Sequence, residues 1–136
     1  MPRSRGPGIT RREVLFCALL PLTACVVDPD APDDGERSLA AWLRRLPPGP
    51  VAAAGFGALY LRGRTEEQSA DWLAERLFDS GLSRPLDRVG FQDLLQRVVA
   101  RRARDFLEED LVILDGWAFP RTEARLLALI ALCGDA

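Results

Sequence analysis

The segment "LVILDGWAFPRTEARLLALIALC", residues 111–133, determines the fold more strongly than any other part of the sequence. Asp115 and Gly116 lie between two short apolar arms, and an Asp-Gly pair in that setting is the strongest short-range signal for a β-hairpin. We therefore expect residues 112–114 to pair with residues 117–119 around a tight turn with positive φ.

The second half of this segment predicts a helix that is apolar all round. Pro120 ends the second arm, and Thr122 is a good N-cap for a helix over residues 123–133. Residues 126–133 are apolar on every face, whereas a surface helix is apolar along one stripe. We expect this helix to be buried at the centre of the domain or to dock on a partner, because it is too short to span a bilayer.

The chain upstream predicts four further helices, over residues 38–46, 51–62, 65–78 and 87–109. Proline- and glycine-rich stretches separate them. The predicted fold class is therefore mainly α: a small helical domain of four to five helices, with a short C-terminal β-hairpin preceding the last helix.

Local signals define the ends and contacts of these helices. Ser38 is an N-cap for the first helix. Gly55 and Gly57 would allow another helix to approach the second one closely. Thr65 and Gln68 form a capping box for the third, with Thr65 as N-cap.

The longest helix carries an arginine run, Arg101–Arg104. Asp105 follows Arg101 by four residues and Glu108 follows Arg104 by four, so we expect ion pairs along the helix and a solvated face rather than an anion site. The apolar stripe of this helix is formed by Phe91, Leu94, Leu95, Val98, Val99 and Phe106.

Residues 1–24 have the order of a signal peptide, with a basic region before the apolar block 14–22. "TRREVL", residues 10–15, resembles the twin-arginine (Tat) export motif, in which a receptor reads the pair Arg11 and Arg12. The match is partial, and the Sec route is the alternative.

"LTAC", Leu22 to Cys25, resembles the lipobox of bacterial lipoproteins. The resemblance implies that Cys25 becomes the first mature residue, carries a diacylglyceryl group with palmitate-type chains, and anchors the protein to the cell envelope. In a Gram-negative host, Val26 after the cysteine implies sorting to the periplasmic side of the outer membrane. A soluble product cut after Ala24 is the alternative.

Residues 25–36 are predicted to be a lipidated acidic tether, and residues 37–136 to be the helical domain. The tether holds aspartates at 28, 30, 33 and 34 among prolines and a glycine. A calcium loop is the alternative for this acid run, but the prolines break the alternate spacing that such a loop needs.

The amino-acid composition limits the kinds of catalytic, metal-binding and nucleic-acid-binding sites that the chain can form. The chain has no histidine, which removes the usual general base and the commonest metal ligand. Beyond residue 24, 14 arginines face 19 acidic residues, so nucleic acid is not an expected partner. With Cys25 lipidated, Cys133 is expected to be a buried small hydrophobe. We assign no catalytic, cofactor-binding or metal-binding residue.

The ending "DGWAFPRTEARLLALIAL", residues 115–132, together with the twin-arginine-type signal, resembles the family of gluconate 2-dehydrogenase subunit 3. The resemblance implies a non-catalytic accessory or small subunit of an exported oxidoreductase complex, with a larger dehydrogenase subunit as its partner. Trp42, Trp72 and Trp117 are candidate interface anchors, although we expect most of them to lie in the core. The alternative is a stand-alone structural or binding lipoprotein of the envelope.

Overall fold

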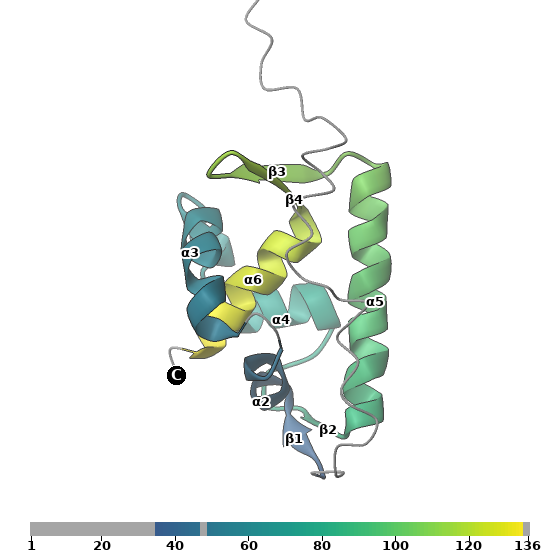
Figure 1. Ribbon diagram of the computed structural model, residues 1–136. Coiled ribbons are helices and arrows are strands. Elements are labelled where there is room, and N and C mark those ends of the chain that lie inside the picture. The colour runs from purple at the N-terminus through teal and green to yellow at the C-terminus, as the bar shows by residue number, and fades with distance from the viewer. Residues whose placement is uncertain (1–34, 47–48, 135–136) are drawn as a thin grey trace, which may run out of the picture.

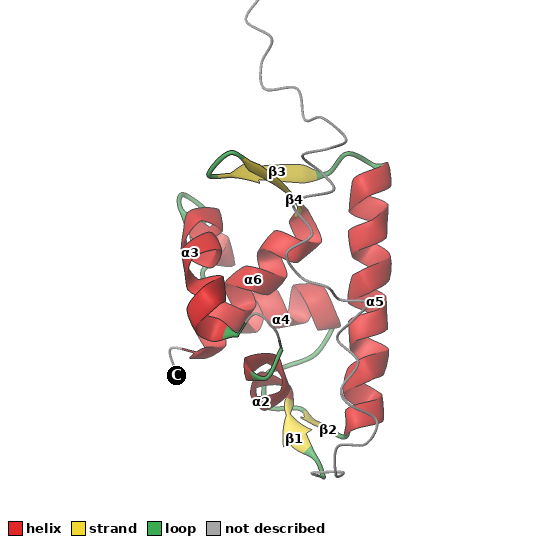
Figure 2. Cartoon of the chain, viewed as in Figure 1, coloured by secondary structure: helices red, strands yellow, loops and turns green. Residues whose placement is uncertain are grey.

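A computed structural model describes residues 35–46 and 49–134. The predicted signal peptide with Arg11 and Arg12, the lipidation residue Cys25 and most of the tether lie outside the described residues. The described part is mainly helical and has a β-hairpin directly before its last helix (Figure 2), so the predicted fold class is confirmed.

The described elements follow one another along the chain as five α-helices, a short 3-10 helix and two pairs of strands. Their order and bounds are β1 Arg37–Ser38, α2 Leu39–Arg44, α3 Pro50–Leu61, η1 Thr65–Glu67, α4 Ala70–Phe78, β2 Pro85–Leu86, α5 Arg88–Leu107, β3 Leu111–Leu114, β4 Trp117–Pro120 and α6 Arg121–Gly134.

Helix α6 runs through the middle of the molecule and packs against α2, α3, α4 and α5 (Figure 1). Residues 126–130 are all buried, and so is Cys133. The expectation of a buried central helix is therefore confirmed. The helix begins at Arg121, so Thr122 lies inside its first turn and is not the N-cap.

The hairpin closes one end of the molecule, above α3 and α6 in Figure 1. Leu114 pairs with Trp117 next to the turn, and φ is +51° at Asp115 and +81° at Gly116. This agrees with the predicted register and turn. The Phe119 ring packs on Phe56 of α3 at 5.1 Å between centroids, which ties the hairpin to the helical core.

The opposite end is closed by a feature that the sequence did not predict. Strands β1 and β2 form a two-residue antiparallel pair, too short to show any periodicity in the sequence. The Trp42 indole stacks on Phe91 at 5.2 Å and donates to the backbone oxygen of Leu86 at 2.8 Å. Ser38 caps α2 as predicted, because its hydroxyl accepts from the N–H of Ala41.

The predicted capping box is wrong. Thr65 begins the 3-10 helix η1, and Gln68 donates to the backbone oxygen of Leu61 instead of reaching back to Thr65. Helix α4 begins at Ala70, where the hydroxyl of Ser69 accepts from the N–H of Trp72. The segment thus folds back onto the end of α3 before the next helix starts.

The predicted ion pair between Arg101 and Asp105 on α5 is also wrong, because both side chains reach other elements. Arg101 lies 3.9 Å from Asp79, and the Asp105 carboxylate accepts from the N–H of Thr122 at 2.7 Å. Asp105 is buried while Phe106 is only partly so. The apolar stripe therefore weakens at its C-terminal end, where α5 meets the start of α6.

One of the two glycines proposed for close helix contact has that role. A Cβ added at Gly57 would lie 3.1 Å from the Cα of Ala128 on α6 and equally near the Cβ of Ala131. Gly55 is exposed and has open space around it, so that part of the expectation is wrong. The absent side chain at Gly57 allows α3 to lie directly against α6.

Candidate functional site

Two groups of arginines and carboxylates surround helix α6, and the first is buried near the hairpin. Glu123 has no exposed surface, and one of its oxygens lies 3.1 Å from Nε of Arg102 on α5. Asp105 caps the first turn of α6 by accepting from Thr122. A carboxylate near a helix N-terminus is stabilised by the helix dipole. We therefore infer that this group holds α5 against α6.

A second ion pair, between partly exposed side chains, lies at the start of α6. Nε of Arg121 lies 2.9 Å from Asp110, in the loop before β3. The hydrogen bond and charge of Asp110 raise the pKa of Arg121 above its ordinary value, in spite of its partial burial. The pair joins the two ends of the hairpin, and so it is structural as well.

The second group is centred on Tyr60 and Glu67. Tyr60 has no exposed surface, and its hydroxyl lies 2.8 Å and 3.0 Å from the two oxygens of Glu67. Nε of Arg125 donates to Glu67 at 2.7 Å and to the tyrosine oxygen at 3.2 Å. Burial, and next the hydrogen bond to Glu67, raise the pKa of Tyr60. Three elements, α3, η1 and α6, meet at these side chains.

Arg64 closes this group from outside. Its guanidinium lies 4.4 Å from the centroid of the Tyr60 ring and donates to the backbone oxygen of Tyr60. Its Nε lies 3.7 Å from Glu67, so one carboxylate faces two guanidinium groups, those of Arg64 and Arg125.

Trp72 lies beside this group on α4 and is partly buried, with two arginines near its ring. The guanidinium carbon of Arg125 is 5.4 Å from the indole centroid, and that of Arg76, one helical turn further along α4, is 5.7 Å away. Both distances fall within the range of cation–π attraction. The indole therefore has two guanidinium groups within cation–π range.

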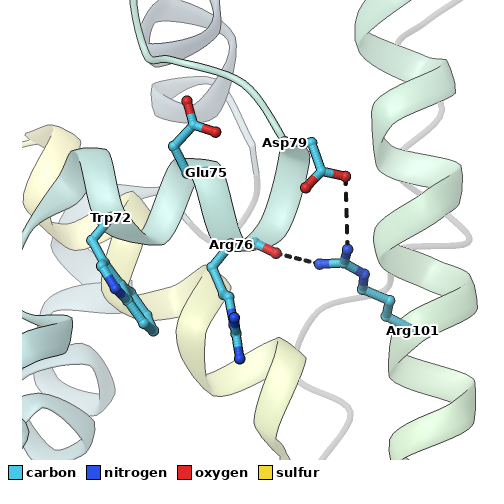
Figure 3. A pocket seen from close by; sticks show the side chains of 5 residues that line it. All are labelled: Trp72, Glu75, Arg76, Asp79 and Arg101. Atoms are coloured by element: carbon cyan, nitrogen blue, oxygen red, sulfur yellow. Dashed lines mark hydrogen bonds and ion pairs between the residues drawn. The ribbon is translucent and has the colours of Figure 1, made fainter.

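Two open depressions adjoin at Trp72 and share Trp72 and Arg76 in their linings. The first has a volume of about 500 Å³ and extends to Glu75, Asp79 and Arg101 (Figure 3). The second, of about 470 Å³, extends over η1 to Glu66. We call these two depressions together the Trp72 groove.

Arg101 forms the far wall of the groove. It donates to the backbone oxygen of Arg76 and lies 3.9 Å from the Asp79 carboxylate (Figure 3). Asp79 ends α4 in the left-handed conformation at φ +50°. A cation at the C-terminal end of a helix is favoured by the helix dipole and by its unpaired carbonyls. Arg101 is thus fixed in place by α4.

The groove combines an indole with arginine and carboxylate side chains. Tryptophan and arginine are the residues that most often dominate protein–protein binding energies. Among the described residues there is no group of three or more His, Cys, Asp and Glu side chains that could hold a metal ion. Burial raises the pKa of the Cys133 thiol, which disfavours its thiolate and agrees with the predicted role as a small buried hydrophobe.

The three tryptophans proposed as interface anchors differ in their surroundings. Trp42 belongs to the core, so its proposed role as an anchor is wrong. Trp117 at the hairpin turn is 42% exposed. Trp72 lines the two depressions described above, together with charged side chains. The predicted site residues Cys25, Arg11 and Arg12 lie outside the described residues.

A scan against protein-family models and searches of curated proteins and of solved structures found no match. Over residues 35–46 and 49–134, no helix combines the length and the apolar character needed to cross a membrane.

Proposed function

We propose that this chain is an exported, lipid-anchored, non-catalytic protein that serves as an accessory or small subunit of an extracytoplasmic oxidoreductase complex. The observation that supports a binding role is Trp72, which lines two adjoining depressions with Arg76 and Arg125 near its ring. The signal-like residues 1–25 supply the argument for export and anchoring.

A non-catalytic role is supported by how Glu67 and Tyr60 are used. Both oxygens of Glu67 are engaged, by Tyr60 and by arginines. A general acid or base needs a proton-accepting atom that can reach a substrate. Glu67 and Tyr60 instead satisfy one another, and their pairing joins three elements of the fold.

The anchor fits the way the chain enters the domain. The first described strand, β1, lies at the end of the molecule opposite the hairpin (Figure 1). A lipid on Cys25 would connect to this end through the remaining tether residues, which can extend over about 3.4 Å each. The hairpin end would then be the one that can lie farthest from the membrane.

Anchoring is tested by fractionating cells that express Cys25→Ser, with Cys17→Ser as the matched control. We expect Cys17→Ser to stay in membranes and Cys25→Ser to be released or left uncleaved, because several acyl chains contribute about 0.8 kcal/mol for each buried CH₂. A processed Cys25→Ser protein that remains in membranes would contradict the lipid anchor.

The subunit role is tested by co-expressing the chain with a dehydrogenase encoded beside its gene. We expect the two to elute together in size-exclusion chromatography, and Trp72→Ala to separate them while Trp117→Ala does not. If the chain elutes alone next to such a dehydrogenase, the stand-alone envelope lipoprotein becomes the better description.

A further inference from the structure

Helix α5 stands at one edge of the molecule, with the other described elements on its inner side (Figure 1). Its outer face exposes a large apolar side chain near each end: Val89 is 65% exposed and Leu107 is 86% exposed. The two residues are 18 positions apart, about five turns at 3.6 residues per turn, so they lie on the same side of the helix. One straight face of α5 thus begins and ends with an exposed apolar residue.

The middle of this outer face is formed by small or uncharged side chains. Gln96 and Ala100 lie on the line between the two apolar ends, and Ala103 lies beside that line. All three are exposed. Packed helices approach to about 8–10 Å, and short side chains at the crossing point allow the smaller separations. A second helix can therefore cross α5 here and still reach both ends of the face.

Two opposite charges lie along one edge of the same face. Asp93 follows Val89 by four residues. Arg104 precedes Leu107 by three, so the two charges lie about one turn inside opposite ends of the face. Both side chains are exposed, and neither has an ion pair within the described residues. The face therefore carries an acid near its first end and a base near its last.

We propose that two copies of this chain pack together through α5, antiparallel and related by a two-fold axis midway between Val89 and Leu107. A two-fold axis brings the same patch of both copies together, so each contact occurs twice. Val89 of each copy then packs on Leu107 of the other, which covers both exposed apolar ends. The inference goes beyond the proposed function and depends on neither the lipid anchor nor the oxidoreductase partner.

Charge complementarity fixes the direction of the pair. In an antiparallel two-fold pair, the same edge of both helices lies on the same side of the contact, so Asp93 of each copy lies beside Arg104 of the other. In a parallel pair these two residues would be 11 positions apart along the axis, about 16 Å, which is too far for an ion pair. The antiparallel dimer gains two symmetric ion pairs that the parallel one lacks.

Arg97 works against the pair and limits its strength. It lies on the same edge near the two-fold axis, so it faces its own counterpart. It is farther round the helix than Asp93 and is exposed, so its guanidinium extends into water and the repulsion is screened. Arg101 is held on α4, and Glu108 is the C-cap beyond the apolar contacts. A contact made by one helix face is also small for an interface, and we therefore expect a Kd of about 50 µM.

The test measures the dimer by sedimentation equilibrium of the full-length chain in mild detergent, with micelles in large excess over protein. Asp93→Arg should weaken the dimer about tenfold, because two attractive contacts become repulsive. Arg104→Asp should do the same. The chain that carries both changes should return to within about threefold of the original Kd, since opposite charges again face each other.

Two alanine variants test the position of the contact. Ala100→Arg places a long charged side chain at the crossing point and should weaken the dimer more than about tenfold. Ala54→Arg is the matched control, since Ala54 is an exposed alanine of α3, and it should change Kd less than about twofold. Arg97→Gln removes the like-charge contact and should strengthen the dimer about twofold. Circular dichroism checks that each variant keeps its helical fold.

Three results would overturn the inference. A chain that stays monomeric at about 500 µM, ten times the expected Kd, would leave another protein or a lipid surface as the cover of this face. Single charge variants that weaken a dimer which the double variant does not restore would show that the copies pair in another way. Equal losses in Ala100→Arg and Ala54→Arg would exclude α5 as the contact. None of these results changes the Cys25→Ser or Trp72→Ala outcome, so the two proposals fail separately.

Discussion

Arg101 and Arg102 are neighbours on α5, but Arg102 pairs with a buried carboxylate and Arg101 with an exposed one. Arg102 lies 3.1 Å from Glu123, which has no exposed surface, whereas Arg101 lies 3.9 Å from Asp79, whose side chain is 74% exposed. The first pair is held between two packed helices, and the second lines the open groove. The comparison shows that burial, and not residue type, separates an arginine that holds the fold together from one that lines an open groove.

The largest effect is expected in the centre of α6, on which the buried pair depends. Leu129 has no exposed surface. Leu129→Asp would place an unpaired charge in the core and should cost more than about 5 kcal/mol, enough to unfold a domain of this size. Circular dichroism and urea unfolding measure it. A folded Leu129→Asp protein would show that α6 is not the centre of the core.

The second prediction contrasts the two carboxylates directly. Glu123→Gln leaves the partly buried Arg102 opposite a neutral amide and should cost about 3 kcal/mol, near the lower end for breaking a buried pair. Asp79→Asn removes an exposed partner and keeps a residue that tolerates positive φ, so it should cost less than about 0.5 kcal/mol.

Urea denaturation of both variants at neutral pH measures the difference. Equal costs for the two variants would break the distinction between a structural arginine and a groove arginine.

The third prediction uses pH to test the hydrogen-bonded group centred on Tyr60 and Glu67. The pKa of Tyr60 is raised in the folded protein, so the folded state holds the phenolic proton more tightly than the unfolded state. The resulting stabilisation is complete below the ordinary value of 10.0 and is lost as pH rises through the higher folded value.

Tyr60→Phe should therefore cost about 1 kcal/mol at neutral pH, and this cost should shrink above pH 10. Urea unfolding of both proteins at a series of pH values measures it. Tyr60 is the only tyrosine of the chain, so no other phenol titrates. A cost that stays constant across that range would mean that the Tyr60 proton contributes nothing to stability.

Short-range signals predicted the parts of the fold that depend on neighbouring residues. Asp115-Gly116 gave the turn because a two-residue hairpin needs positive φ at both positions, and the apolar run of α6 gave the central helix because it has no face suited to water. Ser38 was a correct N-cap for the same reason, since its bond to Ala41 spans three residues.

Contacts between distant residues explain why two predictions from the sequence were wrong. Thr65 and Gln68 match a capping box, but Glu67 two residues after Thr65 bonds to Tyr60 and Arg125, and these bonds draw the segment back onto α3. The arginine run of α5 suggested pairs along its own helix, although Asp105 instead caps α6 at Thr122. Local patterns cannot reveal which distant group will compete for a side chain.

Only part of the Trp72 groove can be predicted from the sequence. Trp72 and Arg76 are four residues apart, the spacing that places two side chains on one face of a helix. Arg125 completes the arrangement from α6, more than fifty residues away, and Arg101 does so from α5. Nothing in their local sequence indicates this meeting, because it depends on how α4 packs between these helices.

The smallest expected effect gives the most direct test of the comparison between buried and exposed arginines. Arg76 is exposed and bonds to no carboxylate of the described residues, so Arg76→Gln should change the free energy of unfolding by less than about 0.5 kcal/mol. Arg102→Gln removes the ion pair between Arg102 and the fully buried Glu123 and should cost about 3 kcal/mol. Both variants remove one positive charge, so a general electrostatic effect would change them equally. Thermal unfolding followed by circular dichroism distinguishes these outcomes. A large loss in Arg76→Gln would mean that this arginine supports the fold through its contact with Trp72, and the groove would then lose its available cation.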